Sequence, residues 1–330
     1  MLLSIIIPLY NAELYIERCL SSCINQNLSP DEYEIIIIND GSTDKSLEVA
    51  KEVTRNSTNA TIITQSNQGV SAARNHGLSV AKGEYIWFVD ADDWIKENCI
   101  KDIYGRVKKS EVDICMISVY YVIDNKCIHK FSYSELSGIV VEGKSFIRNR
   151  KMQAPVQFSI YKHAFLTENL LQFKNGIYHE DCEFSLRSYF FAKKVTFIDE
   201  AIYFYYQNPT SITQVSNPKK SFDYIIVADS LYEFSKTYVE ANDKPFFFNY
   251  ISLDINTALH NLNKISDPSV KKAWENKFHE HKHLISVLLK SSRLKYRLEG
   301  ILFKMSKQYI AIYKFLQLFN KRTYRQRFIA

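Results

Sequence analysis

The sequence predicts an α/β fold with a doubly wound, Rossmann-like mixed sheet in its amino-terminal part and a helical region after it. Four short apolar segments lie within residues 2–90, and each is followed by a polar loop. Strands alternating with helices in this way are typical of a sheet whose loops share one ligand-binding edge. From residue 216 onward, apolar residues recur at helical spacing. We therefore expect a sheet domain over residues 1–215 and a helical accessory domain over residues 216–330.

Each predicted strand is a short apolar run that ends at polar residues. Residues 2–8 end at a proline, and residues 34–38 contain four consecutive isoleucines. In order, the predicted strands are residues 2–8, 34–38, 60–64 and 85–89, with a sheet edge near 202–206. The predicted helices are residues 12–25, 45–53, the segment around 72–75, 182–192, 222–239, 246–264, 269–289 and 298–319.

An acidic cluster follows the fourth predicted strand. Residues 85–89 are aromatic and β-branched, as in a buried parallel strand, and Asp90, Asp92 and Asp93 come directly after them. Ligands of open α/β sheets bind just beyond such strand ends. Mg²⁺ and Mn²⁺ prefer oxygen ligands and commonly take one or two carboxylates plus phosphate oxygens. Asp90-Ala91-Asp92 therefore indicates a clamp for a metal ion and a diphosphate; the alternative is an acidic start to the next helix.

Five motifs in this order resemble those of family 2 glycosyltransferases of the GT-A fold. They are Ser-Ile-Ile-Ile-Pro-Leu-Tyr-Asn at 4–11, Asn-Asp-Gly-Ser-Thr-Asp at 39–44, Asn-Gln-Gly-Val-Ser-Ala-Ala-Arg-Asn-His-Gly at 67–77, Asp-Ala-Asp-Asp at 90–93 and His-Glu-Asp at 179–181. The resemblance covers roughly the first two-thirds of the chain. It implies an inverting, non-processive enzyme that moves a hexose or N-acetylhexosamine from a UDP-sugar to a glycan acceptor, with Mn²⁺ or Mg²⁺ as cofactor. It also implies bacterial surface-polysaccharide synthesis on a lipid-linked acceptor.

The resemblance assigns donor binding to the first four motifs. The Asp40 carboxylate could accept the imide N–H of uracil, although an Asp-Gly pair is also a common turn. The family commonly has aspartate where this chain has Asn39. Tyr10 offers a ring face to the base, and Arg74 could reach the diphosphate or form an ion pair. The implied nucleotide-sugar residues are Pro8, Tyr10, Asn11, Asp40, Arg74, Asp90, Ala91 and Asp92, with Asp92 and Asp90 as metal ligands.

Inversion requires a base on the acceptor side, and the fifth motif supplies the candidate. Asp181 matches the second acid of the family motif and opens a predicted helix whose dipole favours the ionised form. Glu180 would orient Asp181 or bind substrate hydroxyls. A simple helix cap explains the same local pattern. Further candidates on the acceptor side are Trp94, Asp93 and His179.

Composition and absent motifs exclude several other classes of protein. Six cysteines show no Cys-x-x-Cys spacing, so we expect neither a zinc site nor disulfides but a reducing cytoplasm. We expect no signal peptide, and the sequence holds no apolar run of about 18 residues. The first loop lacks the glycines of a dehydrogenase or pyrophosphorylase, and no tryptophan follows an arginine as in processive synthases. A catalytically inactive, membrane-docked sugar-nucleotide-binding or scaffold protein is the remaining alternative.

The carboxyl-terminal segment is strongly basic. Residues 290–330 hold eleven Lys or Arg and one acid, Glu299, so their net charge of +10 leaves −4 for residues 1–289. With interleaved aromatic residues, this pattern indicates attraction to an anionic membrane surface, whereas an ordinary solvated helical face is the alternative. We expect a cytoplasmic protein, peripheral at the inner face of the membrane, with no nucleic-acid partner.

Overall fold

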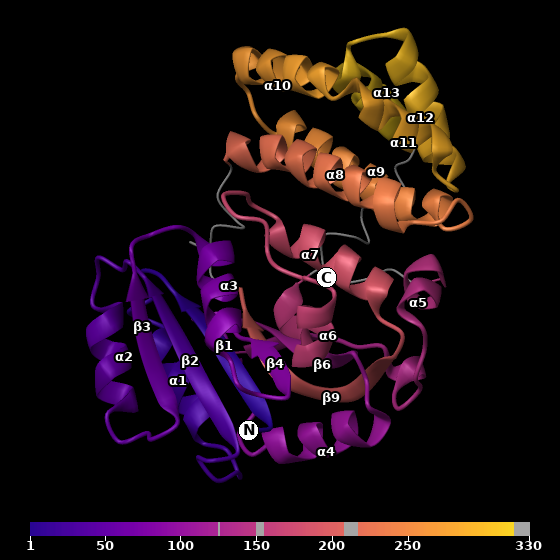
Figure 1. The fold of residues 1–330 in the computed structure, drawn as a ribbon. Helices are drawn as coiled ribbons and strands as arrows, with labels where there is room; N and C mark the ends of the chain where they lie inside the picture. Colours follow the sequence, from indigo (N-terminus) through magenta and orange to yellow (C-terminus); the bar gives the residue numbers. More distant parts are fainter. Residues whose placement is uncertain (125, 150–154, 208–216, 320–330) are drawn as a thin grey trace. The chain divides into compact units, whose positions relative to one another are not determined.

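The structure is a computed structural model that describes residues 1–124, 126–149, 155–207 and 217–319 (Figure 1). Its contacts divide the chain into two compact units, which we describe separately. The sheet unit comprises the described residues of Met1–Phe146, Met152–Gly176 and Ser188–Ser211. The helical unit comprises those of Ile147–Lys151, Ile177–Arg187 and Ile212–Ala330. The predicted domain boundary at residue 215 lies outside the described residues and stays a prediction.

The sheet unit contains one mixed sheet in the strand order β3-β2-β1-β4-β8-β6-β9-β5, with β7 paired to β6. Pairs β1–β2, β2–β3, β1–β4 and β6–β9 are parallel, and the others are antiparallel. The strands are β1 Leu3–Leu9, β2 Tyr33–Asp40, β3 Ala60–Gln65, β4 Tyr85–Phe88, β5 Trp94–Ile95, β6 Ile114–Ile123, β7 Lys126–Phe131, β8 Ser159–Lys162 and β9 Val195–Tyr206. The four strands predicted within residues 2–90 are confirmed. The sheet edge predicted near 202–206 was wrong, because β5 pairs with β9 and places β9 between β6 and β5.

Helices cover both faces of the parallel part of this sheet. Ile5 and Ile7 of β1 belong to a core that includes apolar residues of helix α1 (Ile16–Ile24). Ile6 instead faces helix α3 (Val70–Val80), where a Cβ added at Gly77 would lie 2.4 Å from its Cγ2. Because successive residues of a strand point to opposite faces, α1 and α3 lie on opposite sides of the sheet. The predicted doubly wound arrangement is therefore confirmed.

The remaining helices up to residue 191 follow loops at the sheet. They are α2 Ser46–Thr54, α4 Ile100–Ser110, α5 Gly143–Asn149, α6 His163–Glu168 and α7 Glu180–Phe191, with short 3₁₀ turns at Ser134–Leu136 and Val156–Phe158. Helix α7 confirms the helix predicted over residues 182–192. The boundary between the two units falls within it, so its first residues are grouped with the helical unit.

The helical unit is built from six further helices. They are α8 Pro218–Tyr238, α9 Lys244–Asn263, α10 Pro268–Glu280, α11 Ile285–Lys290, α12 Leu294–Met305 and α13 Tyr309–Phe319 (Figure 1). Asn217 and Asp267 cap α8 and α10 through side-chain oxygens that accept backbone N–H bonds, and each precedes a proline at the first helical position. Among the described residues, none of these helices combines the length and the apolarity that crossing a bilayer needs.

Two of the predicted helices were wrong in their extent. The pattern over residues 269–289 is interrupted by a 3₁₀ turn at Lys282–Leu284, and the pattern over 298–319 is broken between Met305 and Tyr309. Apolar spacing continues across both breaks because the helices on each side pack into the same core. The periodicity of apolar residues alone therefore predicted single helices where the structure has two helices separated by a break.

A buried carboxyl makes the helical unit sensitive to pH. Glu299 of α12 is 2% exposed, and its Oε2 accepts a 2.6 Å hydrogen bond from Asn256 Nδ2 of α9. Burial raises the pKa of Glu299 from 4.5 to about 7. The folded state thus holds a proton that the unfolded state releases, so the free energy of unfolding falls as pH rises from 4.5 through 7.

We expect Glu299→Gln to remove this loss of stability. A pKa raised from 4.5 to about 7 costs the wild type about 3 kcal/mol above pH 7, and glutamine keeps the shape without the ionisation. Urea unfolding followed by circular dichroism at pH 5 and pH 8 should therefore favour the variant at pH 8 only. If wild type and variant show the same dependence on pH, the Glu299 carboxyl is not the titrating group.

Candidate functional site

The loops that follow β1 and β2 are tied together at the carboxyl edge of the sheet. Asn11 adopts a left-handed backbone (φ 48°), and its Oδ1 accepts a 2.9 Å bond from the N–H of Thr43. The N–H of Ala12 donates to the hydroxyl of Ser46 at 2.7 Å. These bonds fix the loop, while the ring of Tyr10 remains 49% exposed. Tyr10 therefore presents an aromatic surface beside two loops of the predicted donor site.

Asp40, at the end of β2, holds the next loop through its carboxylate. Its Oδ1 accepts from Gln65 Nε2 at 2.8 Å and from the N–H of Gln68 at 2.9 Å, and its Oδ2 accepts from the N–H of Gly69 at 2.8 Å. A carboxylate offers about four acceptor positions, so one is left on Oδ2. Contact with a base stays a prediction. The structure adds a scaffolding role for Asp40 that the sequence did not reveal.

We expect Asp40→Ala to destabilise the sheet unit by about 3 kcal/mol or more. The substitution leaves three N–H donors without their charged acceptor, and hydrogen bonds to charged groups are the stronger class. Thermal unfolding by calorimetry measures this loss. Asp31→Ala is the matched control, because Asp31 is exposed. Equal melting temperatures for the two variants would show that Asp40 does not hold the loop.

Asp90 follows β4 and is fixed on both carboxylate oxygens. Arg74 of α3 donates to Oδ1 at 2.8 Å, and Gln157 Nε2 donates to Oδ2 at 3.0 Å. Arg74 is 4% exposed, and its guanidinium also lies 5.3 Å from the ring centroid of Phe173. Of the two roles predicted for Arg74, the structure shows the ion pair with an acid. The carboxylate of Asp90 is thereby oriented while part of it remains accessible to solvent.

Asp92 lies two residues further along and differs in its surroundings. Arg18 donates to its backbone carbonyl at 3.1 Å, not to its carboxylate. In the part of the chain that the structure describes, no side chain of opposite charge pairs with the Asp92 carboxylate. Burial, followed by the charge of Asp90, raises the pKa of Asp92 to about 6. The charge of Arg18 opposes this increase only in part, so a divalent cation could stabilise the ionised Asp92 carboxylate.

Asp93 is placed inside the protein. It is fully buried, and its carboxylate accepts from the Tyr203 hydroxyl at 2.5 Å and from the N–H of Tyr206 at 2.7 Å. Burial raises the pKa of Asp93 well above its usual range, and the charges of Asp92 and Asp90 add to the effect. The structure therefore gives this predicted acceptor-side residue a positioning role, because it ties the turn after β4 to β9.

Trp94 and Ala91 complete the turn. The ring of Trp94 stacks on that of Phe204 at 5.2 Å between centroids, and the Arg18 guanidinium lies 3.7 Å from its centroid. Ala91 is buried. Phe204 and Arg18 therefore pack against the ring of Trp94, which was predicted to lie on the acceptor side.

The predicted catalytic acids begin α7, in the part of it grouped with the helical unit. Oδ1 of Asp181 accepts a 2.8 Å bond from the N–H of Cys182, as an acid at a helix start does. His179 has a left-handed backbone (φ 65°), and its ring stacks on Tyr224 at 3.8 Å. Burial lowers the pKa of His179 to about 4, so the ring is neutral near pH 7. The base role of Asp181 and the orienting role of Glu180 stay predictions.

The sequence analysis missed two residues that interact with predicted site acids, one with Asp90 and one with Asp181. Gln157 belongs to none of the five motifs and reaches Asp90 only through the fold. Asp254 of α9 is 8% exposed, and burial followed by the charge of Asp181 raises its pKa well above its usual range. Asp254 could have been noticed, because it interrupts the buried stripe that Phe247, Ile251 and Ala258 form on α9.

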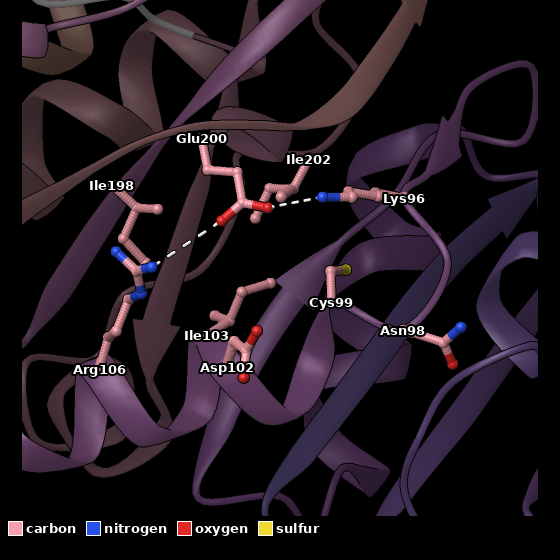
Figure 2. Close-up of a pocket in the computed structure, with 9 residues that line it drawn as sticks. All are labelled: Lys96, Asn98, Cys99, Asp102, Ile103, Arg106, Ile198, Glu200 and Ile202. Carbon is pink, nitrogen blue, oxygen red and sulfur yellow. Dashed lines mark hydrogen bonds and ion pairs between the residues drawn. The ribbon is translucent and has the colours of Figure 1, made fainter.

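A small cavity elsewhere in the sheet unit is separate from these residues. It has a volume of about 40 Å³ and lies between α4 and β9 (Figure 2). Glu200 at its rim accepts a 2.7 Å bond from Lys96 and lies 3.9 Å from Arg106. The cavity has room for a few water molecules but not for a nucleotide. None of the predicted site residues lines it.

Comparison with known proteins assigns this chain to a protein family. Residues 4–172, just over half of the chain, match the family described as Glycosyl transferase family 2. The uncharacterized glycosyltransferase EpsJ of Bacillus subtilis is 31% identical over 221 residues, which are 65% of this chain and 63% of EpsJ. The poly(ribitol-phosphate) beta-glucosyltransferase of Bacillus spizizenii is 32% identical over 208 residues, which are 62% of this chain and 32% of that protein.

A solved structure supports the fold. Residues 1–349 of S. aureus TarS in complex with UDP-GlcNAc superpose with a TM-score of 0.80 over 99% of this chain and 92% of theirs, at 22% identity. That likeness confirms the predicted GT-A fold. The matched region spans less than two thirds of the length of EpsJ. The family match covers more than half of the residues of this chain, and the chain therefore belongs to glycosyl transferase family 2.

Proposed function

We propose that this chain transfers a hexose or N-acetylhexosamine from a UDP-sugar to a hydroxyl of a glycan acceptor, with inversion, in bacterial polysaccharide or teichoic acid synthesis. The observation that carries the proposal is the pair of acids after β4. Asp90 is oriented by Arg74 and Gln157, whereas no cationic side chain among the described residues pairs directly with the Asp92 carboxylate. The UDP-GlcNAc complex of TarS supports a UDP-sugar donor, and the Bacillus spizizenii relative supports a cell-wall or surface polymer.

The residues present fit a divalent cation. In the described residues, no group of three or more His, Cys, Asp and Glu side chains is arranged to hold a metal by itself. Mg²⁺ and Mn²⁺ commonly take one or two carboxylates and complete their shell with substrate phosphates and water. Asp92, with Asp90, would hold Mn²⁺ or Mg²⁺ in this way. When bound, the ion neutralises charge on the leaving diphosphate as a Lewis acid.

The loops after β1 and β2 would bind the nucleoside. The exposed ring of Tyr10 stacks on uracil, and the acceptor position left on Asp40 Oδ2 receives the imide N–H. Pro8 near the end of β1 and Asn11 in the loop after it complete the predicted nucleoside residues. Because Asp40 also holds residues 65–69, base binding and loop order are coupled at one carboxylate.

The acceptor hydroxyl would lose its proton to Asp181. As that oxygen attacks the anomeric carbon, the bond to the diphosphate breaks on the opposite side, which inverts the configuration. Glu180 orients Asp181 or the acceptor. We infer a lipid-linked acceptor, for which the basic carboxyl-terminal segment is the supporting observation.

A thermal-shift panel tests donor binding. A ligand that binds only the folded state raises the melting temperature by mass action. We expect UDP and one UDP-sugar to raise it in the presence of Mn²⁺, and purine nucleotide sugars not to. No shift with any uridine nucleotide would contradict the donor class. A catalytically inactive binding protein is the alternative, and it would show the same shifts without turnover.

A further inference from the structure

Helix α12 carries apolar residues on its outer face. Leu294, Leu298, Ile301 and Met305 are spaced four, three and four residues apart, which places them on one side of the helix. Each of them is between 47% and 79% exposed. The opposite side of α12 packs into the unit through the buried residues Tyr296, Glu299, Gly300 and Phe303. We call the exposed set the α12 stripe.

Cationic side chains flank this stripe, and residues 290–307 hold no exposed acid beside them. By helical spacing, Arg297 and Lys304 lie along one edge of the stripe and Lys295 along the other. Arg293 and Lys307 stand at the two ends of the helix and are exposed. Residues 290–307 contain one acid, Glu299, and its side chain is buried on the inner face. Within residues 290–307, the exposed charged side chains are therefore all positive.

A cavity opens at the carboxyl-terminal end of the stripe. It has a volume of about 470 Å³ and lies among α10, α11, α12 and the start of α13. Its lining combines Lys282, Lys304 and Lys307 with the apolar side chains of Ile285, Leu289 and Met305. Lys304 and Met305 belong to both the cavity and α12. An apolar floor with lysines at its rim suits an amphiphile that carries a negative charge.

We propose that the α12 stripe docks on an anionic phospholipid bilayer. Its aliphatic side chains enter the boundary between headgroups and acyl chains, and the flanking cations meet lipid phosphates. A large exposed apolar patch marks an interaction site, and its positive frame selects a negative partner. A second copy of this chain, paired through the same face, would set those cations against one another. The cavity receives a headgroup at the end of the helix.

The basic carboxyl-terminal segment would contact the membrane through the exposed face of α12 and not through its buried aromatic residues. Of the tail aromatics, Tyr296, Phe303, Tyr309 and Tyr313 are buried and hold the unit together, whereas Phe315 of α13 is 55% exposed. Lys321, Arg322, Arg325 and Arg327, which contribute to the basic tail, lie outside the described residues. Truncation near Lys290 would remove buried core residues, so point variants on the α12 stripe are the better test.

The test is co-sedimentation of the full chain with vesicles. We expect binding to vesicles of phosphatidylglycerol and phosphatidylcholine at low salt, release as salt rises, and no binding to phosphatidylcholine alone. Arg297→Glu with Lys304→Glu, and separately Leu298→Asn with Ile301→Asn, should each lower the partition coefficient by roughly tenfold or more. Lys51→Glu with Lys101→Glu, and Leu170→Asn, are matched controls on exposed residues of the sheet unit and should bind as the wild type does.

Three outcomes would overturn the proposal. If the stripe variants bind vesicles as tightly as the wild type does, α12 does not contact the bilayer. If the wild type binds neutral vesicles equally well, the flanking cations do not contribute to binding. A dimer in sedimentation velocity that dissociates in Leu298→Asn with Ile301→Asn, without vesicle binding, would assign the stripe to a second copy. The proposal rests on the proposed function only in its reason for a bilayer. Thermal shift with UDP and Mn²⁺ therefore stays unchanged in the stripe variants and reports separately on donor binding.

Discussion

Asp92→Asn is expected to abolish Mn²⁺-dependent binding of UDP while the fold remains intact. Asparagine keeps the shape of the side chain but removes the charge that a hard cation requires. The neighbouring contacts of the turn do not depend on the Asp92 carboxylate, because Arg18 bonds to its backbone oxygen and Asp93 carries the bonds to β9. Calorimetric titration of UDP with Mn²⁺ and with chelator measures the effect.

The acidity of Asp92 adds a dependence on pH to the same experiment. Its pKa is raised to about 6 by burial and by Asp90, and a carboxylate must be deprotonated to bind a metal. Mn²⁺-dependent UDP affinity in the wild type should therefore fall as pH drops below about 6. Asp102→Asn, on an exposed acid of α4, is the control. An affinity that is unchanged in Asp92→Asn, or independent of pH between 5 and 7, would refute the metal assignment.

Asp181→Asn is expected to lower turnover by roughly a hundredfold or more, with donor affinity near normal. General-base contributions are typically of that size, and the amide cannot take a proton. The Oδ1 of asparagine is also an acceptor, so it can keep the bond from the N–H of Cys182 in the first turn of α7. The substitution therefore separates the two roles that one carboxylate could have.

The measurement is the rate of sugar transfer together with the melting temperature. Asp181→Ala supplies the comparison, because it removes both the base and the cap. We expect Asn and Ala variants to be similarly slow, but only the alanine variant to lose stability. Near-normal rates in Asp181→Asn, combined with lower stability in Asp181→Ala, would show that Asp181 is a cap and that the base is another residue.

Strands β1, β2 and β4 were predictable because their residues are buried on both faces, whereas β3 at the sheet edge is only partly buried. The four isoleucines of β2 are apolar without alternation, as a strand covered by helices on both sides requires. The loops after β1 and β2 were predictable as site elements because the carboxyl ends of parallel strands lie at one edge of the sheet. Helix breaks such as the one after Met305 were not, because apolar spacing continues across them.

Contacts between distant residues could not be predicted from local pattern. Gln157 and Asp90 are 67 residues apart, and Tyr203 and Asp93 are 110 apart. A run of acids looks alike whether a carboxylate faces solvent or accepts bonds from a strand that follows much later. For this reason the sequence placed Asp90, Asp92 and Asp93 in one acidic cluster, whereas the structure gives each a different environment.

Release of UDP from a UDP-sugar by the full chain tests the proposed activity most directly. We expect slow release without acceptor that requires Mn²⁺ or Mg²⁺, stops with chelator, and is lost in Asp92→Asn while the melting temperature is kept. This result would show that cleavage of the donor depends on both the metal ion and the acids after β4. Binding of UDP-sugars with no release above background, with either ion and with candidate glycan acceptors present, would contradict the transferase and identify a protein that binds sugar nucleotides without turning them over.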